Sequence, residues 1–205
     1  MKIAFGLKAH SGWAALLVLG FDGGNFEVVE RRRVELVEEN WQKQPYHEAE
    51  ELELREAEML VKRGVQAAHR NAIREIRAAI KRAERNGHSI VGCAVLMGEP
   101  MPDWSVAQIL AVHFRMHKAE GVLFREALAK AATKCDLPFV LVPEKQLYDY
   151  AVRTLSTPLG QLTKRIAGLG REIGPPWGKD QKEAALAAMI ALGGKTKVKE
   201  RERLG

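Results

Sequence analysis

The start of the chain is dominated by apolar positions. Met1–Leu7 and Trp13–Phe21 are apolar runs, and Phe26–Val37 alternates apolar with polar side chains. Asp22–Asn25 supplies turn residues that accept positive φ. This pattern predicts a three-strand meander, with a bulge or a solvent-facing edge at Arg31–Arg33, where the alternation breaks.

A helical repeat follows the predicted strands. Glu48–Asn86 carries apolar residues three and four positions apart, which places them on one face of a long helix. Its first turn is rich in glutamate, which suits the positive end of the helix dipole. Gly64 is expected to mark a bend, and Asn86-Gly87 is expected to end the helix.

Two continuous apolar runs, Ser89–Met97 and Pro138–Pro143, are typical of strands buried on both faces. The order of elements predicts an α/β fold in which helices cover a mixed sheet, in a single domain spanning residues 1–192. The remaining helices are expected at Val106–Thr133 (with a kink near Gly121), Lys145–Leu155, Leu159–Leu169 and Lys179–Leu192.

Charge adds a modest preference for acidic partners. The 205 residues carry a formal net charge of +6, and the sequence pI is about 9.4. Half of the excess lies in the last residues, where Lys195–Gly205 holds five Lys/Arg and two Glu. We expect the basic tail, residues 193–205, to be disordered. The charge favours nucleic acid as the partner, although such a tail can also serve solubility alone.

Missing sequence motifs argue against several classes of protein. Cys93 and Cys135 form no CxxC motif, and two buried thiols suit a reducing compartment. A phosphate-binding P-loop, a dinucleotide glycine fingerprint and a Gly-x-Ser-x-Gly elbow are missing from the sequence. With neither a secretory leader nor a long apolar run, a cytoplasmic bacterial-type protein without a membrane partner is expected.

Basic side chains cluster on the predicted hairpin and long helix, where they could follow a phosphate backbone. The alternative is a solvated helix face, balanced by Glu75 and Glu84. The candidate nucleic-acid-binding residues are Lys8, Arg31, Arg32, Arg33, Arg70, Arg74 and Arg77.

A second candidate site lies on the helix predicted at Val106–Thr133. His113 and His117 are four residues apart, a spacing that can chelate a metal ion, and Glu120 lies three residues further on the same side. Zinc or manganese would suit this set. The alternative is that these side chains are partly buried polar residues with no ligand.

The element order resembles the ribonuclease H-like fold. The run Ala4–Gly20 resembles the opening hairpin of its Holliday-junction resolvase branch, in which a Gly-aromatic pair, here Gly12-Trp13, begins the second strand. The run Gly178–Leu192 resembles the last helix of that branch. The resemblance implies a carboxylate site for divalent metals such as magnesium or manganese.

Carried onto this chain, the resemblance identifies Glu99, Asp180 and Glu183 as candidate catalytic carboxylates. The first-strand acid of the family is missing, because Phe5-Gly6-Leu7-Lys8 contains no carboxylate. Lys8 places a cation there instead, which should weaken the binding of a divalent metal. We therefore expect Lys8, Glu99 and the start of the last helix to meet at one edge of the sheet.

Two further resemblances concern the order of elements and short stretches of sequence. Val34–Pro102 resembles, in element order, the middle domain of class 1 release factors, but its loop has Gln42 and Gln44 without a Gly-Gly pair. The resemblance therefore does not imply peptidyl hydrolysis. The whole chain is also similar to a family of bacterial proteins in phrases such as Gly174–Ala188, a similarity that implies no activity.

Three functional hypotheses follow. The first is a nucleic-acid-associated protein of ribonuclease H-like fold whose nuclease-type site is degenerate. The second is a metal-dependent phosphodiesterase or nuclease that uses Glu99, Asp180 and Glu183, with His117 and Glu120 as further candidates. The third is a non-catalytic protein-interaction or ribosome-associated module.

Overall fold

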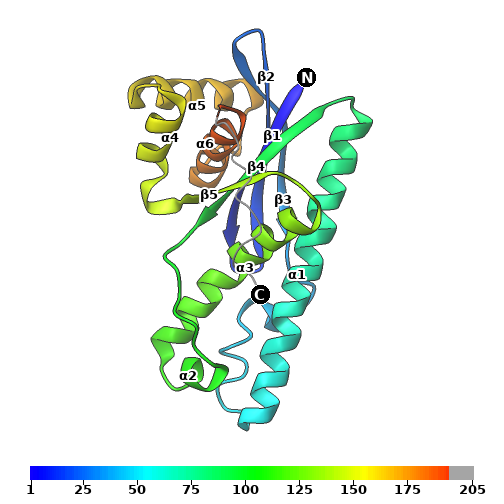
Figure 1. Ribbon diagram of the computed structural model, residues 1–205, viewed down its shortest axis with the longest axis vertical. Helices are drawn as coiled ribbons and strands as arrows, with labels where there is room; N and C mark the ends of the chain where they lie inside the picture. The colour runs from blue at the N-terminus through cyan, green and yellow to red at the C-terminus, as the bar shows by residue number, and fades with distance from the viewer. Residues whose placement is uncertain (194–205) are drawn as a thin grey trace.

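A computed structural model of the chain describes residues 1–193 and contains a five-stranded mixed sheet with helices on both faces (Figure 1). The first three strands form an antiparallel meander, and the last two run parallel to the first strand. The strand order is β3-β2-β1-β4-β5. The expected mixed α/β sheet is therefore confirmed. The strands are β1 (Lys2–His10), β2 (Trp13–Asp22), β3 (Asn25–Glu35), β4 (Ser89–Met97) and β5 (Phe139–Pro143).

The helices connect the parallel strands and then complete the chain. Their bounds are η1 (Asn40–Lys43), α1 (Leu54–Arg85), α2 (Val106–Leu110), α3 (His113–Lys134), η2 (Glu144–Gln146), α4 (Leu147–Leu155), α5 (Leu159–Ile173) and α6 (Lys179–Gly193). The predicted basic tail lies outside the described residues, except for Gly193, which ends α6. Among residues 1–193, no helix combines the length and apolar character needed to cross a membrane.

Each face of the sheet has its own hydrophobic core. Phe5 and Leu7 of β1 face α1 and α3, whereas Ala4 and Leu17 face α4, α5 and α6. Side chains alternate between the two faces of a strand, so a central strand covered on both sides must be apolar throughout. This explains the unbroken apolar runs of β1, β2 and β4.

Several boundaries differ from the expectation. The long helix begins at Leu54 rather than near Glu48, because the preceding residues form turns that bury Tyr46 and Ala49. Gly64 does not interrupt α1. Its missing side chain admits the loop instead, since a Cβ at Gly64 would lie 2.7 Å from Pro45 Cβ.

Two other predicted irregularities occur at different positions. The helix expected from Val106 onward is broken after Leu110 into α2 and α3, and α3 continues through Gly121. The bulge in the hairpin lies before the arginine run: Val18 pairs with Glu30 and Leu19 with Val28, which leaves Val29 as the extra residue.

A close backbone approach fixes α6 against the centre of the sheet. A Cβ on Gly6 of β1 would lie 1.8 Å from the backbone oxygen of Ala184, so only glycine fits. The alanines on α6, including Ala184 and Ala188, are fully buried and let the helix lie close to β1. This packing places the first turn of α6 beside the end of β1.

We expect Gly6→Ala to lower the free energy of unfolding by about 3 kcal/mol, because the added methyl group overlaps the α6 backbone. Urea unfolding checks this. Gly160→Ala is the control: its added Cβ meets nothing within 4 Å in α5, so it should be neutral or stabilising by up to about 1 kcal/mol. Equal stabilities for the two variants would contradict the packing argument.

Candidate functional site

The site lies at the edge of the sheet where three parallel strands end. Because β1, β4 and β5 are parallel, their carboxyl ends lie at the same edge. Lys8 is near the end of β1, and Glu144 follows β5 directly. The first turn of α6 contributes Asp180 and Glu183, three residues apart on one side of the helix. Four charged side chains therefore meet at this edge.

The Lys8 ammonium lies at the centre of these carboxylates. Its Nζ atom is 3.3 Å from Glu144 Oε1 and 3.2 Å from Asp180 Oδ1, and it donates a hydrogen bond to Glu183 Oε2. Lys8 is only 4% exposed and Glu183 only 7% exposed. We call Lys8, Glu144, Asp180 and Glu183 the lysine–carboxylate cluster.

Further basic side chains contact the same carboxylates. Arg125 Nη2 lies 2.8 Å from Glu144 Oε2, and His10 Nε2 lies 3.0 Å from Asp180 Oδ1. Lys179 Nζ is 3.8 Å from Glu183 Oε1. Each carboxylate thus contacts Lys8 and a second basic group, and in Asp180 both contacts are made by Oδ1.

The pKa directions follow from these contacts. Burial alone would lower the pKa of Lys8, but the hydrogen bond and charge of Glu183, with the charge of Glu144, raise it above its usual value. Burial alone would raise the pKa values of Glu144 and Asp180. Arg125 lowers the pKa of Glu144, His10 lowers that of Asp180, and Lys8 lowers both. Both carboxyl pKa values are therefore lowered, and the ionised forms are favoured.

This arrangement is a carboxylate site that already contains its own cation. Three converging carboxylates are the ligands that hard divalent ions prefer. Here a covalently attached ammonium takes the central position, and its raised pKa keeps it charged. An ion entering the cluster would have to displace Lys8 from hydrogen-bonding contacts and meet its positive charge.

The structure brings together two of the three predicted catalytic carboxylates, Asp180 and Glu183. Glu99 is exposed beyond the end of β4 and pairs with Lys145, with 2.7 Å between Nζ and Oε1. Glu144, and not the expected Glu99, makes the contact with Lys8. Its position directly after a predicted strand was the signal that could have identified it. That strand, β5, lies at the edge of the sheet and is only partly buried, so the expectation that it is buried on both faces was wrong.

The predicted metal-binding residues lie in the first turns of α3 and outside the lysine–carboxylate cluster. His113 and His117 are exposed and adjacent, with 3.1 Å between their Nε2 atoms. Glu120 is buried and bound by His47, a residue that the metal-site prediction did not include. A cavity of about 190 Å³ touches both regions, since its lining includes His10 and Arg125 as well as Glu120.

The predicted nucleic-acid-binding arginines on β3 are engaged within the protein. Arg31 donates hydrogen bonds to the carbonyl oxygens of Gly174 and Pro176 at 2.8 and 2.6 Å. Arg32 pairs with an adjacent glutamate, and Arg33 does the same while its guanidinium lies 3.9 Å from the Trp13 ring centroid. These contacts hold the hairpin and the turn before α6 in place.

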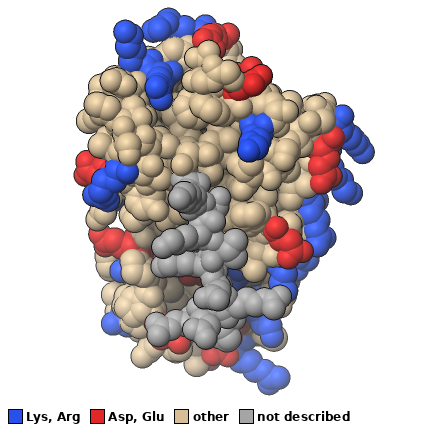
Figure 2. Space-filling view, turned by 45° about the horizontal axis from the view of Figure 1, so that its top comes forward, with Lys and Arg blue, Asp and Glu red and all other residues tan. Residues whose placement is uncertain are grey.

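The basic residues on α1 lie along one exposed face of the helix. Arg74 pairs with Glu38 and Glu75, whereas Arg70, Arg77 and Lys81 are exposed on the same helix face. Figure 2 shows lysine and arginine side chains along the margin of the molecule where α1 lies. We call Arg70, Arg74, Arg77 and Lys81 the α1 basic stripe.

Lys8→Met should lower the free energy of unfolding by about 3 to 5 kcal/mol at neutral pH, because it leaves three carboxylates without their central cation. Chemical denaturation against pH measures this. In the parent protein the lowered pKa values of Glu144 and Asp180 contribute stability above their ordinary values near pH 4, and this stability is lost as the pH falls further.

The variant should respond to acid in the opposite sense. Without Lys8, protonation of one carboxylate relieves repulsion among the three, so stability should rise as the pH is lowered from 7 towards 5. Lys145→Met, which removes an exposed lysine that pairs with Glu99, is the control and should leave the pH profile nearly unchanged. A Lys8→Met profile parallel to that of the parent would contradict the proposed role of the ammonium.

Comparison with solved structures supports the topology, although the sequence identity is low. No family model matches the chain, and no curated protein matches its sequence. The structure of Thermus thermophilus RuvC in complex with a Holliday junction substrate is 11% identical, covers 94% of each chain and gives a TM-score of 0.50. Another Thermus thermophilus RuvC structure is also 11% identical, covers 92% of each chain and gives a TM-score of 0.46. The chain therefore has the ribonuclease H-like fold that the sequence resemblance implied.

Proposed function

We propose that this protein binds nucleic acid through a ribonuclease H-like domain without cleaving it by metal-dependent hydrolysis. The observation that carries the proposal is the buried ammonium of Lys8 among Glu144, Asp180 and Glu183. A single ammonium already occupies the space between the side chains that could hold a divalent ion. The degenerate site then serves as a structural joint between β1, β5 and α6.

The electrostatics of the cluster oppose metal-dependent hydrolysis. Such hydrolysis needs a divalent ion that polarises the phosphate and generates the attacking hydroxide. An ammonium offers hydrogen bonds and one positive charge, but it supplies no coordination positions for water or phosphate oxygen. Because the pKa of Lys8 is raised, the group remains an ammonium across the physiological range.

Two observations support nucleic acid as the partner. A RuvC chain of similar fold has been solved with a Holliday junction substrate. In this chain, the net charge is +6, and the α1 basic stripe presents several cations along one exposed face. Cations in a row along a helix can contact successive phosphates, which gives affinity without base specificity.

Restoring a carboxylate at position 8 is the sharpest test of the degenerate site. The parent protein should not cleave duplex, single-stranded or four-way-junction DNA, nor RNA, with Mg²⁺ or Mn²⁺. Lys8→Asp should be destabilised without divalent ions and stabilised as Mn²⁺ is added, because four carboxylates then face one another. Thermal unfolding against Mn²⁺ concentration measures the difference between the two proteins.

The control for that test is Lys145→Asp, which makes the same change at an exposed lysine outside the cluster. Its unfolding midpoint should not respond to Mn²⁺. Divalent-dependent cleavage by the parent protein that Glu183→Gln abolishes would replace this proposal with the phosphodiesterase alternative.

Binding should depend on salt and on the α1 basic stripe. We expect affinity for DNA or RNA to fall steeply between low and physiological salt. Arg70→Ala, Arg77→Ala and Lys81→Ala together should reduce the slope of log K against log salt by about 3 if each side chain contacts a phosphate. Fluorescence anisotropy at several salt concentrations measures this slope, with purified ribosomes tested separately by co-sedimentation.

The matched control removes the same charge from the opposite face of the sheet. Lys164, Arg165 and Arg171 are exposed on α5, and replacing them with alanine should leave the slope within about 1 unit of the parent value. Equal losses in the two triple variants would point to a net-charge effect. Binding that is absent at low salt would end the nucleic-acid proposal.

A further inference from the structure

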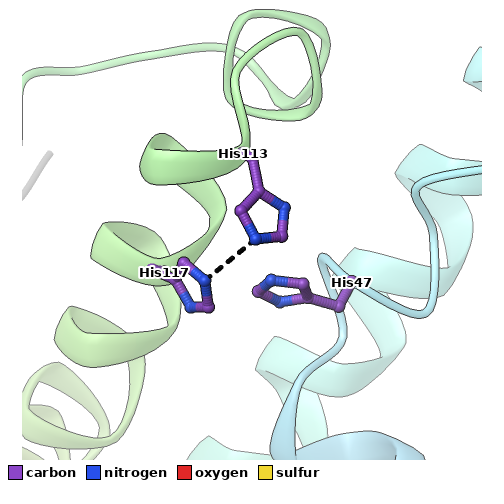
Figure 3. Close-up of side chains that lie close together, drawn as sticks. All are labelled: His47, His113 and His117. Carbon is purple, nitrogen blue, oxygen red and sulfur yellow. Dashed lines mark hydrogen bonds between the residues drawn. The ribbon is translucent and has the colours of Figure 1, made fainter.

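Three histidines from two distant parts of the chain meet beside the first turns of α3. His47 lies in the turns that precede α1, whereas His113 begins α3 and His117 lies one turn further (Figure 3). One possible donor atom from each histidine lies within 4.8 Å of the other two. Figure 3 shows the rings gathered around a common centre, with the dashed line joining His113 and His117.

One carboxylate orients a histidine ring from outside the cluster, and a second carboxylate lies near another ring. His47 Nδ1 lies 2.8 Å from Glu120 Oε2, and the His47 backbone N–H donates to Glu120 Oε1 at 3.2 Å. Glu120 is only 3% exposed, so this contact is well protected from water. His113 Nδ1 faces Glu50 Oε1 at 3.8 Å on the outer side of the cluster. A carboxylate accepts hydrogen bonds, so the Glu120 contact places a proton on His47 Nδ1.

That contact leaves the Nε2 atom of His47 free to bind a ligand at the centre of the three rings. This nitrogen is buried and has no hydrogen-bond partner among the described residues. The His113 and His117 Nε2 atoms lie 3.1 Å apart, and together they can form only one hydrogen bond. A shared metal ion would bind the nitrogen lone pairs of these imidazole rings that hydrogen bonds leave unused.

We propose that His47, His113 and His117 bind one zinc ion through their inward nitrogens. Imidazole suits zinc, whereas Mg²⁺ and Ca²⁺ require oxygen ligands. Nitrogens bound to tetrahedral zinc at about 2.1 Å lie about 3.4 Å apart, so small side-chain rotations bring this cluster to the required geometry. Glu120 acts as the carboxylate that fixes the ring of His47, and it is not a ligand in this arrangement.

The bound ion would add a coordinated link between two segments that the contacts of His47 with Glu120 already join. His47 belongs to the loop between β3 and α1, and the other two ligands belong to α3. Because both α3 histidines are exposed, the fourth coordination position faces solvent and can hold water or an exchangeable ligand. This site uses none of the residues of the lysine–carboxylate cluster.

Metal titration of the untagged full-length chain, stripped with a chelator, tests the site. We expect one zinc ion per chain by calorimetry and elemental analysis, and an unfolding midpoint that rises with Zn²⁺ but not with Mg²⁺. Co²⁺ should give the strong visible absorption of a four-coordinate site. Failure of the parent protein to bind zinc stoichiometrically would overturn the proposal.

The variants separate this site from a simple pair of helical histidines. His47→Ala and His117→Ala should each weaken zinc binding at least tenfold and abolish the visible Co²⁺ bands. Glu120→Gln should weaken zinc binding by about 10- to 100-fold through loss of the charged partner of His47. His88→Ala, which lies beyond the end of α1, is the control and should bind as the parent does.

Unaltered zinc affinity in His47→Ala would show that the loop supplies no ligand and would also overturn the proposal. If that variant does not fold, Glu120→Gln provides the test, because it acts on the loop through His47 and leaves all three histidines in place. Nuclease activity and nucleic-acid binding play no part in these measurements, so their outcome is independent of the proposed function.

Discussion

The attraction between the Lys8 ammonium and three carboxylates is the constraint on which the functional edge of this molecule depends. A buried cation is stable only when its partners are close and ionised, and here those partners come from the end of β5 and the start of α6. The interaction therefore ties together elements that are far apart in the sequence. It also sets the chemistry of the edge, because a charge attached to the backbone cannot exchange with solvent ions.

Two clusters of different chemistry lie near α3. One consists of ionised groups that attract one another, and the other consists of imidazoles whose nitrogens lie close together. Arg125 and Glu120 on the same helix contact the two clusters separately, and the cavity of about 190 Å³ lies against both residues. The Lys8 ammonium and the histidines best suited to bind a metal ion therefore occupy separate positions.

The sequence predicted the elements whose signals are local. The unbroken apolar run of β4 and the paired acids on α6 were identified correctly in type and position. Glu144 and His47 were missed as members of their clusters because their partners are brought near only by the parallel strands and by the folded loop. The start of α1 was placed too early because glutamates favour a helix locally, while burial of Tyr46 and Ala49 imposes turns.

Gly6 has a consequence beyond packing. Because α6 rests on β1 through backbone atoms and small side chains, the positions of its two acidic residues are determined by the scaffold. The charge at position 8 is specified separately from this backbone contact, and changing it costs stability because the carboxylates around it lose their partner. Two residues of one strand therefore have separate roles: Gly6 sets where the acidic residues of α6 lie, and Lys8 sets the charge that faces them.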